Sequence, residues 1–122
     1  MGIANYTNMS ELMNEMLKAG AVVSVSDMAA EAEKRNFILA SEGERAGKAD
    51  LENGFIALAD ALHRAGAIKP VPADEHESHL LRLYESGKLA ENGYGGKDGD
   101  EFIKIKWVAL TENLPVIVNL NL

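Results

Sequence analysis

Hydrophobic residues recur at helical spacing in the first part of the chain. Five of them form one apolar stripe and predict an amphipathic helix over 9–19: Met9, Leu12, Met13, Met16 and Leu17. Asn8 and Glu11 have the spacing of a capping box before this helix, and Gly20 is a natural stop after it. We interpret the methionines as core, with an adaptable binding face as the alternative.

The next segments predict a short strand and two more helices. Alternating β-branched residues indicate a strand at 21–25, and Ser26 is the predicted cap of a second helix that ends near residue 42. The apolar run 37–39 is wider than one helical face, so we expect it to be well buried. Asp50 is the predicted N-cap of a third helix, 51–65, which Gly66 ends. Gly54 inside this helix costs roughly 1 kcal/mol relative to alanine.

Proline and glycine divide the second half of the chain. Two prolines make 67–73 a predicted stiff connector, because a proline disfavours helix in the residue before it. A fourth helix is predicted at 74–86 and is closed by Gly87. The segment 90–101 is rich in glycine and in acidic residues, which predicts a flexible acidic loop.

The C-terminal part of the chain, from residue 102 onward, alternates with a period of two. Between 102 and 110, one face collects the apolar residues Ile103, Ile105, Trp107 and Ala109, and Lys104 and Lys106 lie on the other. Residues 115–122 alternate again after a turn at 111–114, so we expect a β-hairpin with one buried face. A lone hairpin is marginal, and the 21–25 strand is a candidate to extend it. The predicted fold is one α+β domain, 1–122, with about four helices packed on a small antiparallel sheet.

Composition and charge narrow the classes of function. The 122 residues include no cysteine, which excludes disulfides, thiolate catalysis and cysteine-ligated zinc. The net charge is −7 and the twelve basic residues are scattered, so we expect no direct nucleic-acid binding. An acidic surface suits a basic protein partner, with solubility alone as the simpler alternative. No apolar run approaches the roughly 18 residues of a membrane span, and no secretory signal is visible, so we expect no membrane contact and a cytoplasmic location.

The segment 74–87, DEHESHLLRLYESG, concentrates the candidate chemistry. Asp74 and Glu77 have capping-box spacing, and acidic residues favour the start of a helix. His76 is expected on a buried stripe with Leu80, Leu83 and Tyr84, and His79 on its flank. The two histidines are three residues apart rather than four, and no third ligand is visible nearby. We therefore predict a capped helix start with no metal and no cofactor, and a metal or acid–base enzyme centred on His76 and His79 is the alternative.

Other motifs are incomplete. Residues 94–100 lack the G-x-x-x-x-G-K-[ST] spacing of a phosphate loop, and residues 98–101 hold only one D-x-D pair of a calcium loop. No serine lies in a G-x-S-x-G setting. Without a complete catalytic constellation, we predict that the chain is not an enzyme.

A helix, a short strand, the segment VSVSDMAAEAEKRN, then ALADALHRAGAI and a terminal hairpin together resemble the element order of winged-helix domains. The resemblance implies a transcriptional regulator that reads DNA with the helix 50–65. That helix carries Glu52 and Asp60 against a single Arg64, whereas base reading needs Arg, Lys, Asn or Gln at the exposed start. The segment between the second and third helices is also too long for the pattern.

The leading hypothesis is a small acidic protein-binding module that blocks or adapts a larger partner, such as a basic nucleic-acid-binding protein. A phage-encoded anti-defence inhibitor or a toxin-immunity protein has this kind of role. We predict that partner contacts come from the acidic loop and the exposed hairpin lysines: Glu91, Tyr94, Asp98, Asp100, Glu101, Lys104 and Lys106. A homodimer through the sheet edges is a further alternative, which the lysines there disfavour.

Overall fold

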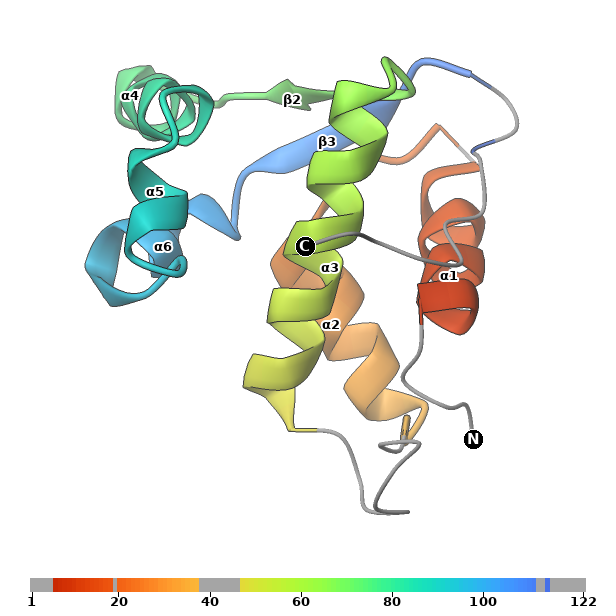
Figure 1. Cartoon of the computed structure of the whole chain (residues 1–122). Coiled ribbons are helices and arrows are strands. Elements are labelled where there is room, and N and C mark those ends of the chain that lie inside the picture. Colours follow the sequence, from red (N-terminus) through yellow and green to blue (C-terminus); the bar gives the residue numbers. More distant parts are fainter. Residues whose placement is uncertain (1–5, 19, 38–46, 112–113, 115–122) are drawn as a thin grey trace.

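The computed structural model describes residues 6–18, 20–37, 47–111 and 114, which form six helices and a three-stranded antiparallel sheet (Figure 1). The predicted α+β class is confirmed, and two short helices bring the number above four. The elements are α1 (Tyr6–Lys18), β1 (Val23–Ser24), α2 (Val25–Lys34), α3 (Lys48–Arg64), β2 (Ile68–Val71), α4 (Glu75–Glu85), α5 (Lys88–Glu91), α6 (Gly96–Phe102) and β3 (Lys106–Ala109).

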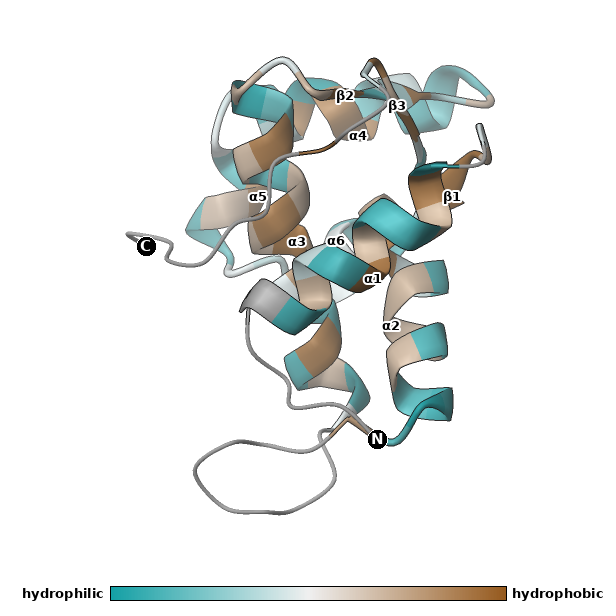
Figure 2. Cartoon of the chain, turned by 90° about the vertical axis from the view of Figure 1, so that its right-hand side faces the viewer, coloured by the Kyte–Doolittle hydropathy of each residue, from teal (hydrophilic) through white to brown (hydrophobic). Residues whose placement is uncertain are grey.

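The first three helices pack against one another and build much of the core. Met9 and Met13 are buried in it and Met16 lies at its edge, so the methionine stripe of α1 is a core face. Apolar and polar stretches alternate along these helices, as Figure 2 shows, which is the pattern of helices with one buried side. Phe55 and Leu58 of α3 are fully buried, which confirms the amphipathic character predicted for that helix.

Three predicted N-caps are wrong. The first helix begins at Tyr6, so Asn8 lies inside it and does not cap it. The cap of α2 is Ser24, not Ser26: Ser24 Oγ accepts from the Asp27 N–H at 3.0 Å, and Asp27 Oδ2 accepts from the Ser24 N–H at 3.0 Å. This capping box satisfies two donors at once, so the last strand residue also starts the helix. The third helix begins after Gly47, which places Asp50 in its first turn, where its charge suits the helix dipole.

The second helix is shorter than predicted. It ends at Lys34, and Asn36 has a left-handed backbone with φ of 58°, a conformation that breaks a helix. Phe37 is buried although it follows the helix end. The rest of the predicted helix, including Ile38 and Leu39, lies outside the described residues.

The sheet has the strand order β1–β3–β2. The stiff connector predicted at 67–73 is wrong, because residues 68–71 form β2 and pair with β3. Pro70 lies opposite Trp107 there, which an edge strand tolerates because its outer side needs no N–H donor. On its other side, Trp107 pairs with Val23 of β1. The first strand of the predicted hairpin corresponds to β3, which pairs with β1 and β2. The second predicted strand, residues 115–122, lies outside the described residues.

The α4–α6 lobe, residues 72–105, separates β2 and β3 in sequence although the two strands are neighbours in the sheet. In Figure 1 the lobe lies to the left of α3, and α1 lies to its right. The flexible loop predicted at 90–101 is wrong, because this segment includes the end of α5 and most of α6. Buried Leu89 and Phe102 anchor these short helices to the core. Outside the lobe, the elements follow the order helix–strand–helix–helix–strand–strand.

Candidate functional site

The α4–α6 lobe carries most of the excess negative charge. Its 34 residues include eight acidic and four basic side chains, a net charge of −4 out of the chain's −7. Six of the acidic residues are exposed: Asp74, Glu75, Glu85, Glu91, Asp98 and Asp100. The lobe therefore presents the acidic character that composition alone could not locate.

The four predicted acidic contacts all lie on this lobe. Glu91 is exposed at the end of α5, and Asp98 and Asp100 are exposed on α6. Glu101 is half-buried and faces α4, where its Oε2 lies 3.9 Å from Nε2 of His76. Helix α6 thus presents carboxylates to solvent from a folded element rather than from a loop.

Tyr94 has a structural role in addition to any contact. It is half-buried, its ring stacks on Phe102 with centroids 5.7 Å apart, and its backbone has φ of 58°. Burial raises the pKa of its hydroxyl, with a smaller contribution from the negative charge of Asp60. Tyr94 also borders a cavity of about 120 Å³ between α3 and α6, together with Ile56 and Ile103.

Both predicted lysine contacts, Lys104 and Lys106, are exposed. Lys106 also forms an ion pair within the protein. Its Nζ lies 2.6 Å from Oδ2 of Asp27, which ties β3 to the start of α2. Burial acts to raise the pKa of Asp27, but hydrogen bonds from Lys106 and Ser24 outweigh it and lower that pKa below the ordinary value. A partner that binds Lys106 therefore competes with Asp27.

His76 of α4 is not placed as predicted. Its side chain is 54% exposed, so it does not lie on the buried stripe. His79, which was predicted on the flank of that stripe, is also exposed. The stripe begins one turn later, at Leu80, because the first turn of α4 projects beyond the core. Within the ranges that the structure describes, no group of three His, Cys, Asp or Glu residues is placed to hold a metal ion.

The predicted cap of α4 is confirmed in its first half. Asp74 Oδ1 accepts from the Glu77 N–H at 2.8 Å, which satisfies one of the unpaired donors of the first turn. The Glu77 carboxylate accepts from the Ala73 N–H at 3.0 Å rather than from Asp74, so the reciprocal bond of a capping box is displaced by one residue.

A hydrogen-bonded cluster at the seam between α3 and α4 joins Asp60, His63 and Tyr84. The Tyr84 hydroxyl donates to Asp60 Oδ1 at 2.6 Å, and His63 Nδ1 lies 3.1 Å from the same hydroxyl oxygen. Because the single phenol proton points at the carboxylate, the oxygen accepts from His63. We therefore assign a proton to Nδ1 of His63 in this cluster.

Tyr84 is held in its protonated form at this seam. Burial raises the pKa of its hydroxyl well above the ordinary range, and the hydrogen bond to the negative Asp60 raises it further. A phenol in this state is neither a general base nor a nucleophile near neutral pH. The hydrogen bond from Tyr84 to Asp60 thus fixes α4 against α3.

An aromatic group surrounds this cluster. Trp107 of β3 contacts the edge or face of three rings, with centroids 5.5 Å from His63, 6.2 Å from Tyr84 and 6.5 Å from Phe102. Its side chain is only 1% exposed, and its Nε1 has no hydrogen-bond partner among the described residues. T-shaped ring contacts of this kind stabilise a core beyond the area they bury.

An open pocket of about 200 Å³ adjoins the cluster and is lined by Asp60, His63, Arg64, Tyr84 and Glu85. Arg64 bonds Asp60 Oδ2 at 3.1 Å from one turn further along α3. Sequence reasoning missed this site, because its contacts join residues 21 and 24 positions apart. The one available signal was Tyr84 on a predicted buried stripe, since a buried tyrosine hydroxyl requires a partner.

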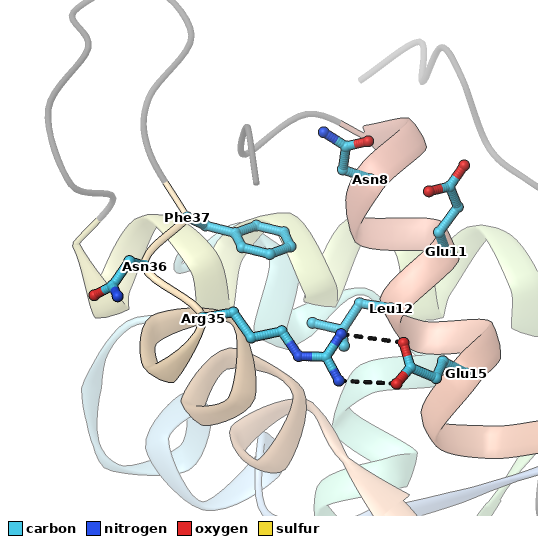
Figure 3. A pocket seen from close by; sticks show the side chains of 7 residues that line it. All are labelled: Asn8, Glu11, Leu12, Glu15, Arg35, Asn36 and Phe37. Carbon is cyan, nitrogen blue, oxygen red and sulfur yellow. Dashed lines mark hydrogen bonds and ion pairs between the residues drawn. The ribbon is translucent and has the colours of Figure 1, made fainter. Parts of the chain in front are cut away.

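A larger polar groove, of about 640 Å³, lies between α1 and the end of α2 (Figure 3). Arg35 spans it and binds Glu15 through two nitrogens, at 2.9 and 3.1 Å, and Glu31 through Nε at 3.0 Å. The hydrogen bond from Arg35 lowers the pKa of Glu15, and both carboxylates raise the pKa of Arg35. Exposed ion pairs of this type contribute little to stability. We therefore interpret Arg35 as a surface link between α1 and α2 across the groove.

The exposed start of α3 bears on the winged-helix resemblance. Lys48, Asp50 and Asn53 are exposed there. Lys48 and Asn53 could contact bases, whereas the negative charge of Asp50 would repel phosphates. Further along the helix, Asp60 is bonded to Tyr84, so the lobe occupies part of the outward side of α3.

None of the helices in the described ranges is long and apolar enough to cross a bilayer. Comparison of the chain with models of protein families, with curated proteins and with solved structures found no match in any of the three.

Proposed function

We propose that this chain is a non-enzymatic protein-binding module that docks the α4–α6 lobe on a basic surface of a larger partner and so blocks or adapts that partner. The observation that carries the proposal is the placement of the lobe: a segment with a net charge of −4 is inserted between two neighbouring strands. Strands that hold both ends of a segment reduce the entropy lost when that segment binds.

Electrostatics support a basic partner. Glu91, Asp98 and Asp100 are exposed on the short helices α5 and α6, and such a surface speeds the approach of a positively charged protein. A basic nucleic-acid-binding protein of the cytoplasm is the partner class that this charge fits. An anti-defence inhibitor of phage type or a toxin-immunity protein would act in this way.

The test begins with affinity capture of the partner from the native host. Its association rate is then measured with Asp98→Lys/Asp100→Lys and with a matched control, Glu33→Lys/Asp50→Lys, which alters the net charge equally from exposed positions outside the lobe. We expect the lobe variant to associate several-fold more slowly at low salt and the difference to shrink as salt rises. Equal rates for the two variants would contradict the proposal. Circular dichroism of both variants checks that α6 persists.

A winged-helix regulator is the second candidate, favoured by the element order outside the lobe and by the strand order β1–β3–β2. A gel-shift series with duplex DNA at low salt separates it from the first, because a DNA-binding domain loses affinity steeply as salt rises. If α3 reads DNA, Lys48→Ala should reduce the shift. Absence of any shift at low salt removes this candidate.

A metal protein or enzyme centred on His76 and His79 stays an untested alternative. Zinc would then raise the melting temperature, and His76→Ala would abolish the rise.

Sedimentation of the purified chain tests the homodimer alternative in the same preparation.

A further inference from the structure

We propose that the pocket at the seam between α3 and α4 receives an arginine side chain of the partner. The inference rests on the proposed function, because the basic partner supplies the arginine. The pocket combines a half-buried carboxylate, two aromatic walls and a second carboxylate at the rim, and these are the groups that recognise a guanidinium.

The carboxylate of Asp60 is oriented and only partly used. Its side chain is 25% exposed, Oδ1 accepts from Tyr84, and Oδ2 accepts from Arg64 at 3.1 Å. A carboxylate offers about four acceptor positions, so two bonds leave capacity for another donor. The hydrogen bond from the Tyr84 hydroxyl holds this carboxylate in place, which reduces the ordering cost of a new bond.

Arg64 is a weakly held occupant that a stronger guanidinium can replace. Its side chain is 79% exposed, and it pairs with Asp60 across one helical turn. Pairs of this geometry on exposed helix surfaces contribute only about 0.3–0.5 kcal/mol. An arginine delivered by a docked protein would be shielded from water and would bind Asp60 more strongly than Arg64 does.

The walls favour a flat cation. The rings of His63 and Tyr84 lie with centroids 5.7 Å apart at an interplanar angle of 42°, and guanidinium groups stack on aromatic faces. Two carboxylates, Asp60 and Glu85, outweigh the one resident guanidinium, so an anionic group would meet net repulsion. The volume of about 200 Å³ suits one side chain rather than a nucleotide.

Trp107 provides a built-in reporter for this pocket. It is the single tryptophan of the chain, it is buried, and its ring lies 5.5 Å from His63 and 6.2 Å from Tyr84. A cation that binds against these pocket walls should alter its fluorescence without touching it.

The experiment titrates the full chain with N-acetyl-arginine amide at low salt and follows Trp107 fluorescence and the ring resonances of Tyr84 and His63. We expect a saturable response to arginine, a weaker one to N-acetyl-lysine amide and none to the neutral N-acetyl-citrulline amide. Asp60→Asn keeps an acceptor for Tyr84 but removes the charge, and should weaken arginine binding by about tenfold or more. Asp50→Asn makes the same chemical change ten residues earlier in α3, about 15 Å away by helical rise, and should leave binding unchanged.

Arg64→Ala gives the sharpest discrimination. Removal of the competing guanidinium should tighten arginine binding, whereas a pocket that binds anions would lose its main ligand. Tighter phosphate binding than arginine binding, or weaker arginine binding to Arg64→Ala, would overturn the proposal. A wild-type chain that gives no saturable response to arginine also overturns it, and leaves the docking of the acidic lobe to be judged separately by the Asp98 and Asp100 variants.

Discussion

Replacement of Gly99 with alanine should destabilise the protein, although alanine is the better helix former. Gly99 is buried within α6, and a Cβ added there would overlap the carbonyl carbon and oxygen of Tyr94 and lie 3.1 Å from its Cα. These are backbone atoms, and the Tyr94 backbone is already left-handed. The overlap can be relieved only if α6 moves away from the segment before it.

Gly54 of α3 provides the matched comparison. A Cβ at this position would lie 2.5 Å from Cε and 3.3 Å from Sδ of Met9, which are the far end of a flexible side chain. Alanine gains about 0.8–1 kcal/mol of helix propensity at an interior position. Movement of Met9 consumes part of that gain, so Gly54→Ala should leave the free energy of unfolding within about 0.5 kcal/mol of wild type.

At Gly99 the same gain meets a larger cost. Overpacking against a well-packed region costs about 1–3 kcal/mol, and backbone overlap belongs at the upper end of that range. We therefore expect Gly99→Ala to lose about 1–2 kcal/mol of unfolding free energy. With a urea dependence of about 2 kcal/mol per molar, the middle of the range for small proteins, the midpoint should fall by about 0.5–1 M.

The assay is urea unfolding of both variants, followed by far-ultraviolet circular dichroism and by Trp107 fluorescence. Hydrogen exchange in α6 checks whether Gly99→Ala opens that helix alone before global unfolding. A Gly99→Ala midpoint at or above wild type would refute the reasoning. Equal losses at Gly54 and Gly99 would refute the distinction between backbone and side-chain neighbours.

Three further variants test single contacts. Tyr84→Phe should lower the free energy of unfolding by about 1–2 kcal/mol, because Asp60 loses a buried donor, and an unchanged urea midpoint would count against the seam cluster. Asp74→Ala should cost about 1 kcal/mol in a thermal melt through the lost cap of α4, with Asp74→Asn as the tolerated control. The folded state lowers the pKa of Asp27, so its contribution is present above the unfolded pKa and disappears as pH falls through the folded value. The stability gap between wild type and Asp27→Asn should therefore narrow from neutral pH to well below 3.8, and a constant gap would show that the ionised group contributes nothing.

Periodicity predicted the elements whose burial follows from their own sequence. The burial of the apolar stripe of α3 and of Trp107 is confirmed. Periodicity alone shows which face of an element is buried, whichever element packs against that face. The cap by Asp74 is also a local contact and was predicted correctly.

Tertiary pairing overrode the local rules elsewhere. Pro70 predicted a connector, but its segment forms the edge strand β2 and pairs with β3. An edge strand tolerates proline because its outer side needs no N–H donor. The glycines of 93–99 predicted a loop, but residues 96–102 form α6. This helix is held by the close approach of Gly99 to the Tyr94 backbone and by the burial of Phe102. Neither contact can be read from neighbouring residues.

The seam pocket was inaccessible to sequence reasoning for a related physical reason. Asp60 and His63 lie on one face of α3, and Tyr84 joins them only because α4 packs there. The sequence pattern indicated His76 and His79 instead, which are close in sequence but exposed on the structure. Residues brought together by packing, rather than by spacing, define the site.

Hydrogen exchange of the chain with and without its captured partner tests whether the lobe is the docking surface. We expect new protection to gather in the α4–α6 lobe, residues 72–105, and to include the seam with α3 around Asp60. Protection confined to α1 and α2, with the lobe unchanged, would contradict it.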